Sequence, residues 1–470
     1  MATFATREQM PRNRVMIARP APDRRTVLAV LATGVLAPRA ALSATAPATA
    51  PKAWSLGDLH ALSPSLRLVD PSGDRSGGAD TRALQASLDL GGVTLLKAGG
   101  RYHLRNRLRL SHGASGLACP GGMADLVMLT GAGQFSLSAY EPSEQFGDHH
   151  VAIHAEGVAR PILDGLRVTL AGAETPCVAI PFALRGCSDL RIGRLEYTGF
   201  RETWRGMLTL DSCHGGRIDH LYCHDCTPNT DVLPSLQVSA VVLDDNRLDG
   251  ASSRDIHFGL VRYANLLLGP RAMARYGPQS DAVTVMSDGG GGLVFDLITG
   301  DGVGEVLDCW GDGVTASIKA RDTQLYPVKL MYGAEHCVIA ADVDRTGLSA
   351  VYLSGNADGP WRRRQGVAHN RVRVQATNVG ALHDEVAAIW RPMPPMQPGV
   401  YLDGPGLAHA PEDNHVSGQV FGAPGAGMPY VIGASASGPG NVLELGGGGF
   451  VRGFSSGAGS LRTPPAIRRL

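Results

Sequence analysis

A two-part pattern repeats through the C-terminal two-thirds of this chain. Its first part is a short apolar strand that ends in a polar residue, as in Met207-Leu-Thr-Leu-Asp211 and Gly399-Val-Tyr-Leu-Asp403. A turn rich in Gly, Asn or Asp follows, and a second alternating strand such as Arg217-Ile-Asp-His-Leu221 then begins. One such unit cannot bury its apolar face alone, so the units must stack and share a core. The repeat therefore predicts a single all-β solenoid.

The spacing of the repeat predicts the size of one coil. We take Val306, Val328 and Val351 as equivalent positions, and they lie 22 and 23 residues apart. This spacing suits a three-strand coil with short turns. Other intervals are longer, which predicts loops that protrude from the stack, among them residues 358–364 and 390–398. Loops on a rigid scaffold are where binding residues concentrate.

The composition excludes several classes of protein. The chain has 43 basic and 43 acidic residues, so it lacks the positive charge that nucleic acid or an anionic membrane would attract. It has 61 Gly residues but no Gly-X-Y period, which excludes collagen. Short apolar runs with many Gly residues favour strands and turns over helices.

The N-terminus has the features of an export signal. Arg24-Arg25 precedes an apolar run from Thr26 to Ala37, which is too short to span a bilayer, and Ala44-Thr45-Ala46 offers a cleavage site. We predict a twin-arginine-type signal peptide at 1–46, and hence a periplasmic or secreted bacterial protein. A chance pair of Arg residues is the alternative. No other segment is apolar enough to span a membrane. We expect a linker at 47–65, the β-helix domain at 66–448 and an irregular tail at 449–470.

The eight Cys residues are expected to be buried thiols. An even count in an exported chain permits disulfides, but a chain of this length can bury a large core without them. One cluster could bind Zn²⁺ or act in redox chemistry: Cys213, His214, His220, Cys223, His224, Asp225 and Cys226. Residues 217–223 alternate as a strand, however, which sends His220 and Cys223 to opposite faces and disfavours both roles.

The segment before the repeats resembles a known cap. Residues 80–89 predict a short amphipathic helix with Asp80 or Thr81 as its N-cap, followed by strands at 92–96 and 98–104. This arrangement is similar to the N-terminal cap of the pectate-lyase-like superfamily, although Lys97 and Ala98 depart from its usual residues. The resemblance, together with the repeats, implies a right-handed parallel β-helix with an N-terminal cap helix. It also implies binding of, or action on, an extended polysaccharide.

Acidic residues at the end of the first strand are the first candidates for catalysis. Parallel coils align equivalent residues, so we expect one file of carboxylates from Asp211, Asp244, Asp308 and Asp403. Asp281 and Glu305 belong to neighbouring strands. Two carboxyl groups on adjacent coils can serve as the acid and base of glycoside cleavage. The alternative is that these residues only cap turns.

Basic residues near these acids are the second group of candidates. Lys329 lies one coil beyond Glu305 and could be a base or could neutralise a uronate, with Tyr332 close behind it. Arg271 and Arg275 could bind a sugar carboxylate. An ion pair without function is the alternative for Lys329. We expect catalysis from Asp281, Glu305, Asp308 and Lys329, and substrate binding by Arg271, Arg275, Tyr332 and Asp244.

Two established chemistries of the superfamily lack support. Asn229-Thr230-Asp231 and Asp244-Asp245 resemble motifs of polygalacturonases, but they lie too close together for separate coils, and the later motifs of that family do not follow. No calcium-binding loop of pectate lyases is recognisable. Acids alone can bind Ca²⁺, so a Ca²⁺ requirement stays open, while no metal ligands are assigned.

These features predict an exported polysaccharide lyase or glycoside hydrolase with its site between residues 271 and 332. A non-catalytic glycan-binding or surface-scaffold β-helix is the alternative, and a fructosyl-type transfer enzyme is a third reading. Convergence of Asp281, Glu305, Asp308 and Lys329 in a solvent-facing groove would favour an enzyme. The sequence leaves the sugar, its linkage and the oligomeric state open.

Overall fold

The chain folds into two parallel sheets between which it alternates. The computed structural model describes residues 53–129, 149–171, 178–199, 206–228, 238–244, 252–286, 291–355, 366–404, 410–426, 431–435, 437–447 and 466–469. All of them belong to one unit, Ala50–Leu470. The predicted signal peptide lies outside the described residues, as do Asn229-Thr230-Asp231 and Asp245.

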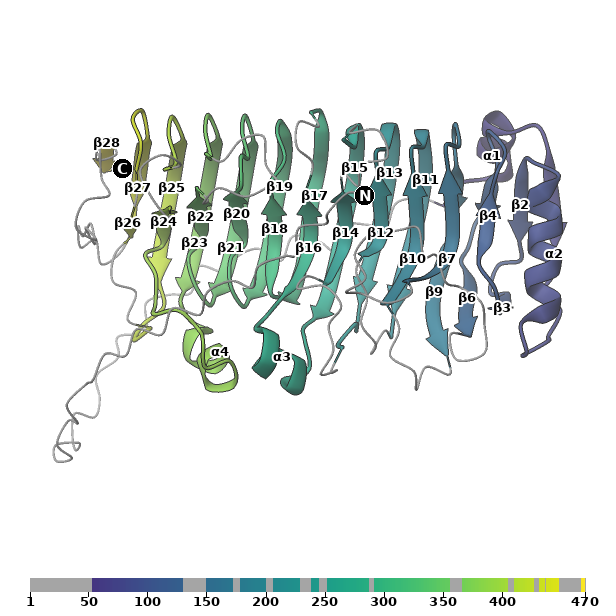
Figure 1. The fold of residues 1–470 in the computed structure, drawn as a ribbon, viewed down its shortest axis with the longest axis horizontal. Coiled ribbons are helices and arrows are strands. Elements are labelled where there is room, and N and C mark those ends of the chain that lie inside the picture. Colours follow the sequence, from purple (N-terminus) through teal and green to yellow (C-terminus); the bar gives the residue numbers. More distant parts are fainter. Residues whose placement is uncertain are drawn as a thin grey trace, which may run out of the picture. The chain divides into compact units, whose positions relative to one another are not determined.

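Every strand pairing in both sheets is parallel (Figure 1). Among the described residues, a 17-stranded sheet contains β1 (Leu66–Val69), β2 (Val93–Leu96), β3 (Arg101–Leu104), β5 (Gly116–Ala118), β6 (Ala124–Leu129), β8 (Ile162–Asp164), β9 (Leu166–Ala171), β11 (Ser188–Thr198), β13 (His214–His224), β15 (Arg254–Leu266), β17 (Leu293–Val303), β19 (Val314–Thr323), β21 (Val338–Thr346), β23 (Arg371–Val379), β25 (His415–Gly422), β27 (Val442–Gly446) and β28 (Ala466–Arg469).

The second sheet has 11 strands in the same part of the chain. They are β4 (Leu108–Leu110), β7 (His149–Glu156), β10 (Val178–Arg185), β12 (Gly206–Asp211), β14 (Val238–Asp244), β16 (Ser280–Val285), β18 (Glu305–Cys309), β20 (Val328–Met331), β22 (Val351–Ser354), β24 (Val400–Asp403) and β26 (Ile432–Ala434). The described residues also form four short helices: α1 (Leu56–Leu62), α2 (Gly78–Asp89), α3 (Pro270–Tyr276) and α4 (His383–Ile389).

The register aligns apolar residues of successive coils in the core. Phe258 of β15 lies opposite Phe295 of β17, and the two rings stack with centroids 4.4 Å apart. On the 11-stranded sheet, Leu307, Val328 and Val351 are opposite one another and fully buried. Each strand buries one face only when its neighbours stack on it. The predicted parallel β-helix is thus confirmed.

The N-terminal end has more structure than the sequence predicts. α2 begins at Gly78, two residues before the expected N-cap, and the buried Asp80 instead accepts hydrogen bonds from the backbone N–H groups of Ser72 and His103, at 2.7 and 2.8 Å. Asp80 therefore joins the helix to β3 rather than capping it. Within the segment predicted as a linker, Ser55 caps α1, which packs Leu59 into an apolar cluster.

Buried polar and sulfur groups line the turns between the sheets. Asn370, Asn414 and Asn441 form a ladder in which each side-chain amide donates to the next side-chain oxygen, at 3.0 and 3.1 Å. The seven Cys residues in the described part of the chain are buried and form no disulfide, and the sulfur atoms lie 3.9 Å apart in Cys223–Cys226 and 4.0 Å apart in Cys309–Cys337. Cys177 lies outside the described residues.

Two further observations concern the predicted segments. No helix among the described residues is both long enough and apolar enough to cross a membrane. In the segment predicted as an irregular tail, β28 pairs with β27 and adds a last strand to the 17-stranded sheet.

Candidate functional site

Strand β18 brings two acidic side chains together on either side of a buried pair of residues. Its consecutive residues Val306 and Leu307 are both fully buried in the core, although side chains normally alternate along a strand. Because this pair occupies the core, the flanking Glu305 and Asp308 reach the same place, where both contact Lys329. The sequence feature behind this arrangement is the short interval between the two acids.

Lys329 lies on the outer face of the 11-stranded sheet. Its neighbours Val328 and Leu330 point into the core, so by alternation Lys329 points away from it. Its Nζ donates to Glu305 Oε2 at 2.8 Å and to Asp308 Oδ2 at 3.2 Å. Both oxygens contact the same nitrogen, so Glu305 Oε2 and Asp308 Oδ2 lie at most about 6 Å apart.

Asp281 of β16 completes a group of four, which we call the Lys329 cluster: Asp281, Glu305, Asp308 and Lys329. Asp281 lies opposite Glu305 in the parallel register. Its Oδ2 accepts a hydrogen bond from Thr284 at 2.6 Å and a longer one from Ser239 at 3.4 Å. Ser239 and Thr284 were not identified from the sequence, because small hydroxyl residues are common in strands of any role.

The Lys329 cluster is secluded from solvent. The side chain of Lys329 is 14% exposed, that of Glu305 5% and that of Asp308 0%, and Asp281 is 1% exposed. The four predicted catalytic residues therefore converge, but not in the open groove expected for them. Charges removed from water in this way are costly unless each finds a partner.

Burial and mutual repulsion change the protonation of the acids. Burial raises the pKa of Asp281 well above its usual range, and the charges of Glu305 and Asp308 add to this effect. Burial also raises the pKa of Glu305 to about 7, even though Lys329 opposes the shift. Three ionised carboxyl groups beside one ammonium group would leave a net negative charge in a buried place. This repulsion favours the protonated form of Asp281, and Glu305, with a pKa of about 7, is divided between its two forms at neutral pH.

Lys329 stays protonated. Burial disfavours its charge, but the attraction of Asp308, Glu305 and Asp281 outweighs burial and raises its pKa well above the usual value. A lysine that remains an ammonium ion at neutral pH cannot accept a proton from a substrate. Of the two roles predicted for Lys329, the structure favours charge neutralisation over general base.

The residues next to the cluster lie beneath another segment of the chain. Tyr326 and Ser349 follow Glu305 on the next two coils, and Ser349 donates a hydrogen bond to Gln397 at 3.2 Å. Trp390 and Met393 pack against Tyr326 as part of a small apolar cluster. Residues 390–398, predicted as a protruding loop, therefore fold back over the outer face beside the Lys329 cluster. We call them the covering segment.

The register corrects two predicted alignments. Leu307, not Val306, is equivalent to Val328. Asp211 and Asp244 do lie opposite each other, but Asp308 lies opposite Thr284 and Lys329 and so belongs to a different file. Asp403, which lies opposite Ser354, continues the file of Asp211 and Asp244 as predicted. Asp308 is in register with Thr284 and Val242, two residues before the position of Asp244, and so stands outside the predicted carboxylate file.

Aromatic residues surround the cluster. Trp310, two residues after Asp308, donates its Nε1–H to Asp308 Oδ1 at 2.8 Å and makes an edge-to-face contact with Tyr332 at 4.5 Å between centroids. Along the outer face, Lys329 is followed in register by Tyr352 and then Tyr401. Tyr332 thus contacts the cluster through Trp310. Trp310 was not identified as a site residue from the sequence.

The other predicted substrate-binding residues lie elsewhere. Arg271 and Arg275 are exposed on α3, whose chain leads into β16, and the Arg275 guanidinium lies 5.2 Å from the ring of Tyr276. Asp244 is the last residue of β14 and is in register with Asp211, away from Lys329. Their roles in substrate binding stay predictions.

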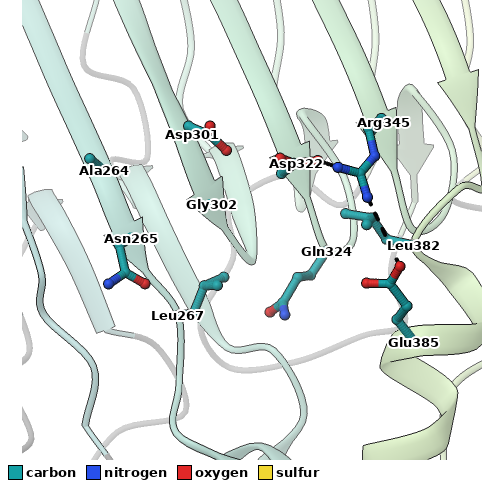
Figure 2. Close-up of a pocket in the computed structure, with 10 residues that line it drawn as sticks. All are labelled: Ala264, Asn265, Leu267, Asp301, Gly302, Asp322, Gln324, Arg345, Leu382 and Glu385. Atoms are coloured by element: carbon teal, nitrogen blue, oxygen red, sulfur yellow. Dashed lines mark ion pairs between the residues drawn. The ribbon is translucent and has the colours of Figure 1, made fainter.

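A separate hollow lies at the C-terminal ends of neighbouring strands in the 17-stranded sheet (Figure 2). It has a volume of about 500 Å³, and its walls come from the ends of four successive strands and from α4. Polar side chains border it: Asn265, Asp301, Asp322, Gln324, Arg345 and Glu385. Arg345 pairs with Asp322 at 2.7 Å and lies 3.9 Å from Glu385. None of these residues was predicted as a site.

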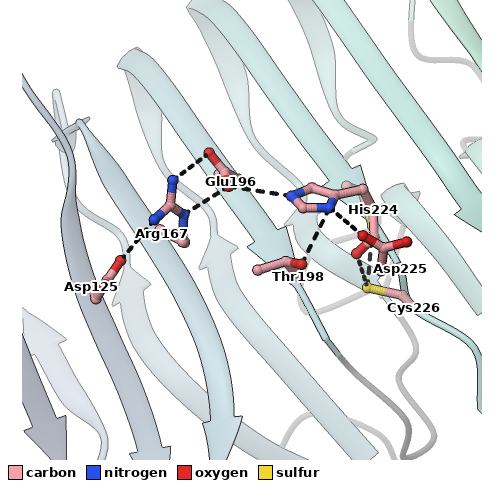
Figure 3. A network of polar contacts seen from close by, with 8 residues as sticks. Asp125, Arg167, Glu196, Thr198, His224, Asp225 and Cys226 are labelled. Carbon is pink, nitrogen blue, oxygen red and sulfur yellow. Dashed lines mark hydrogen bonds and ion pairs between the residues drawn. The ribbon is translucent and has the colours of Figure 1, made fainter.

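The Cys/His region forms an ion-pair network rather than a metal site (Figure 3). His224 contacts Glu196 at 3.2 Å and Asp225 at 2.9 Å, and Arg167 joins Glu196 to Asp125. Cys223 faces the core, whereas His220, three residues earlier, does not belong to it. In the described part of the chain, no three His, Cys, Asp or Glu residues are placed to hold a metal ion.

Comparisons with known proteins give little beyond the fold. No family model matches the chain, and no curated protein is significantly similar to it. Among solved structures, the Streptococcus pneumoniae surface protein and adhesin PfbA is similar at a TM-score of 0.47 and 10% identity, over 85% of this chain and 97% of that one. The pre-mature bacteriophage phi29 gene product 12 has a TM-score of 0.32 and 13% identity, over 85% of this chain and 55% of that one. At these values neither likeness supports a functional argument.

Proposed function

We propose that this protein is a carbohydrate-active enzyme that cleaves an extracellular polysaccharide at the Lys329 cluster. The observation that carries the proposal is the pair of carboxyl groups, Glu305 and Asp308, held on one ammonium group with the pKa of Glu305 near 7. A carboxyl group with such a pKa can donate and accept a proton at neutral pH. Structural ion pairs also shift pKa values, so activity is the test.

The geometry favours hydrolysis over elimination. A retaining glycoside hydrolase uses two carboxyl groups about 5–5.5 Å apart, one as acid and one as nucleophile. The oxygens of Glu305 and Asp308 that contact Lys329 lie at most about 6 Å apart, which is closer than the roughly 6.5–9.5 Å typical of inverting enzymes. Glu305 would protonate the leaving oxygen, and Asp308 would stabilise or attack the sugar carbon. A lyase would need a base, and Lys329 cannot be that base while it is protonated.

Substrate access sets a condition on the proposal. Glu305 is 3% exposed, and the covering segment packs on Tyr326 and Ser349 beside it. A sugar reaches Glu305 only when this segment moves away. Movements of loops over active sites are common and exclude water from the reaction. We therefore expect substrate to reach Glu305 only after the covering segment has opened.

The test is incubation of the purified protein with a panel of acidic and neutral polysaccharides. Reducing ends would indicate hydrolysis, ultraviolet absorbance of unsaturated products would indicate a lyase, and longer or cyclic products would indicate transfer. We expect reducing ends, with the rate reduced about 10²–10⁴-fold in Glu305→Gln. Glu196→Gln is the matched control, because Glu196 is a half-buried, ion-paired carboxyl group on the other sheet.

A non-catalytic glycan-binding or scaffold β-helix is the second candidate. It is favoured by the seclusion of the Lys329 cluster, in which each charge already has a protein partner. No product of any kind over the whole panel would support this candidate and overturn the enzyme proposal. Full activity in Glu305→Gln would also overturn the assigned role of Glu305.

A further inference from the structure

The hollow at the C-terminal ends of β15, β17, β19 and β21 includes a position of a repeated turn that has no side chain. In seven successive coils, from β11 to β23, the residue after the equivalent strand position has a left-handed backbone conformation. These residues are Gly199, Asp225, Asn265, Gly302, Asp322, Arg345 and Asn378, with φ between 52° and 75°. Asn and Asp tolerate this conformation better than most residues.

Gly302 is the member of this series at the hollow that has no side chain, while Gly199 is a second glycine of the series and lies outside the hollow. Its neighbours on either side, Asn265 and Asp322, border the hollow, and Gly302 itself lines it. A Cβ atom placed on Gly302 would meet no atom closer than 3.5 Å, so there is room for a side chain. We call this hollow the Gly302 groove.

The Gly302 groove combines hydrogen-bond donors and acceptors with apolar surface. Burial and a side-chain hydrogen bond to Asp301, which accepts from the protonated form, raise the pKa of Asp322. The Gln324 Oε1 atom is buried and has no hydrogen-bond partner among the described residues. Leu267 and Leu382 contribute apolar patches between these polar groups (Figure 2).

The charges of the groove limit its ligand. Asp301, Asp322 and Glu385 are acidic, and Arg345 is the single basic residue among those that line it. Arg345 is already paired with Asp322. An anionic ligand would therefore meet an excess of negative charge, whereas a cation would be attracted.

We propose that the Gly302 groove binds a hydroxyl-rich sugar that carries no negative charge, with an amine-bearing sugar bound most tightly. Sugar hydroxyl groups both donate and accept, and the amides of Asn265 and Gln324 and the carboxyl groups of Asp301 and Asp322 offer both functions. The apolar patches suit the faces of a sugar ring. This site is independent of the Lys329 cluster, which belongs to the other sheet.

The test uses three tetrasaccharides with the full-length protein: glucosamine, glucose and galacturonate oligomers, each titrated by calorimetry. We expect affinity to fall in that order. Gly302→Asn places a side chain in the groove and continues the series of Asn265 and Asn378, whose backbone angles it shares. It should weaken binding of the glucosamine oligomer at least tenfold and leave the unfolding temperature within a few degrees.

Asp225→Asn is the matched control, because it changes the same turn position at a coil outside the groove. Its affinity should equal that of the wild type. The proposal is overturned if no oligomer binds, if the galacturonate oligomer binds as tightly as the glucosamine oligomer, or if Gly302→Asn binds unchanged. Asp301→Asn gives a second check, since it should weaken binding of the amine-bearing oligomer more than that of the glucose oligomer.

Discussion

Ion pairs lie on the outer faces of both sheets, but in opposite environments. On the 11-stranded sheet, Lys329 and Glu305 have side chains 14% and 5% exposed. On the 17-stranded sheet, Arg167 and Asp125 are 37% and 35% exposed. Exposed pairs are screened by water and contribute little to stability, whereas a buried charge that loses its partner is strongly destabilising. The loss of an ion pair is therefore expected to change the free energy of unfolding more on the 11-stranded sheet than on the 17-stranded sheet.

Removal of Lys329 should have the largest effect. Lys329→Met leaves Glu305 and Asp308 buried without their counter-charge, and we expect the free energy of unfolding at neutral pH to fall by about 3–5 kcal/mol. Denaturant titration measures it. Lys319→Met is the control, because Lys319 is exposed on the opposite sheet, and its effect should stay within about 0.5 kcal/mol. Equal effects of the two substitutions would contradict the contrast between the faces.

The pH dependence of stability should be intermediate. The pKa of Glu305 is raised from 4.5 to about 7 on folding, so the folded state holds a proton that the unfolded state releases. This bound proton adds about 3 kcal/mol to the free energy of unfolding. The contribution is complete below pH 4.5 and is lost as the pH rises through 7. Denaturant titrations at intervals from pH 4 to 8 measure how the free energy of unfolding depends on pH.

Glu305→Gln provides the comparison for this profile. Glutamine does not titrate, so the decline of stability between pH 4.5 and 7 should be smaller than in the wild type. Asp281, whose pKa is also raised, acts in the same direction in both proteins. Identical profiles for wild type and Glu305→Gln would refute the assignment to Glu305.

Disruption of the exposed network should have the smallest effect. Arg167→Met removes the contacts of Arg167 with Asp125 and Glu196 (Figure 3). We expect a loss below about 1 kcal/mol, and a loss that shrinks further in high salt because exposed charges are screened. A loss comparable to that of Lys329→Met would show that exposure does not separate the two faces.

The fold was predictable because the repeat itself carries the information. Alternating apolar residues in each unit require stacking, and the structure stacks them in parallel register. The convergence of Glu305, Asp308 and Lys329 was also predictable, since the interval between the two acids is unusually short. These inferences depend on local spacing, which the sequence contains directly.

The environment of the site was not predictable in the same way. Whether Glu305 is open or secluded depends on the position of residues 390–398, whose composition suggested a protruding loop. The register of Asp308 depends on the pairing of β18 with its neighbours, in which Leu307 and not Val306 lies opposite Val328. The Gly302 groove depends on the absence of a side chain at one turn, which becomes visible only when the coils are superimposed by their pairing.

Helix α4 touches both outer faces of the molecule. Glu385 and the preceding Leu382 line the Gly302 groove, while Trp390, which follows the last helical residue, packs against Tyr326 and against Gly277 after α3. With seven residues, α4 is about two turns long. Glu385 in the groove and Trp390 at the start of the covering segment therefore belong to one short stretch of chain. Within the described residues, α4 thus links the edge of the groove to the covering segment outside the core.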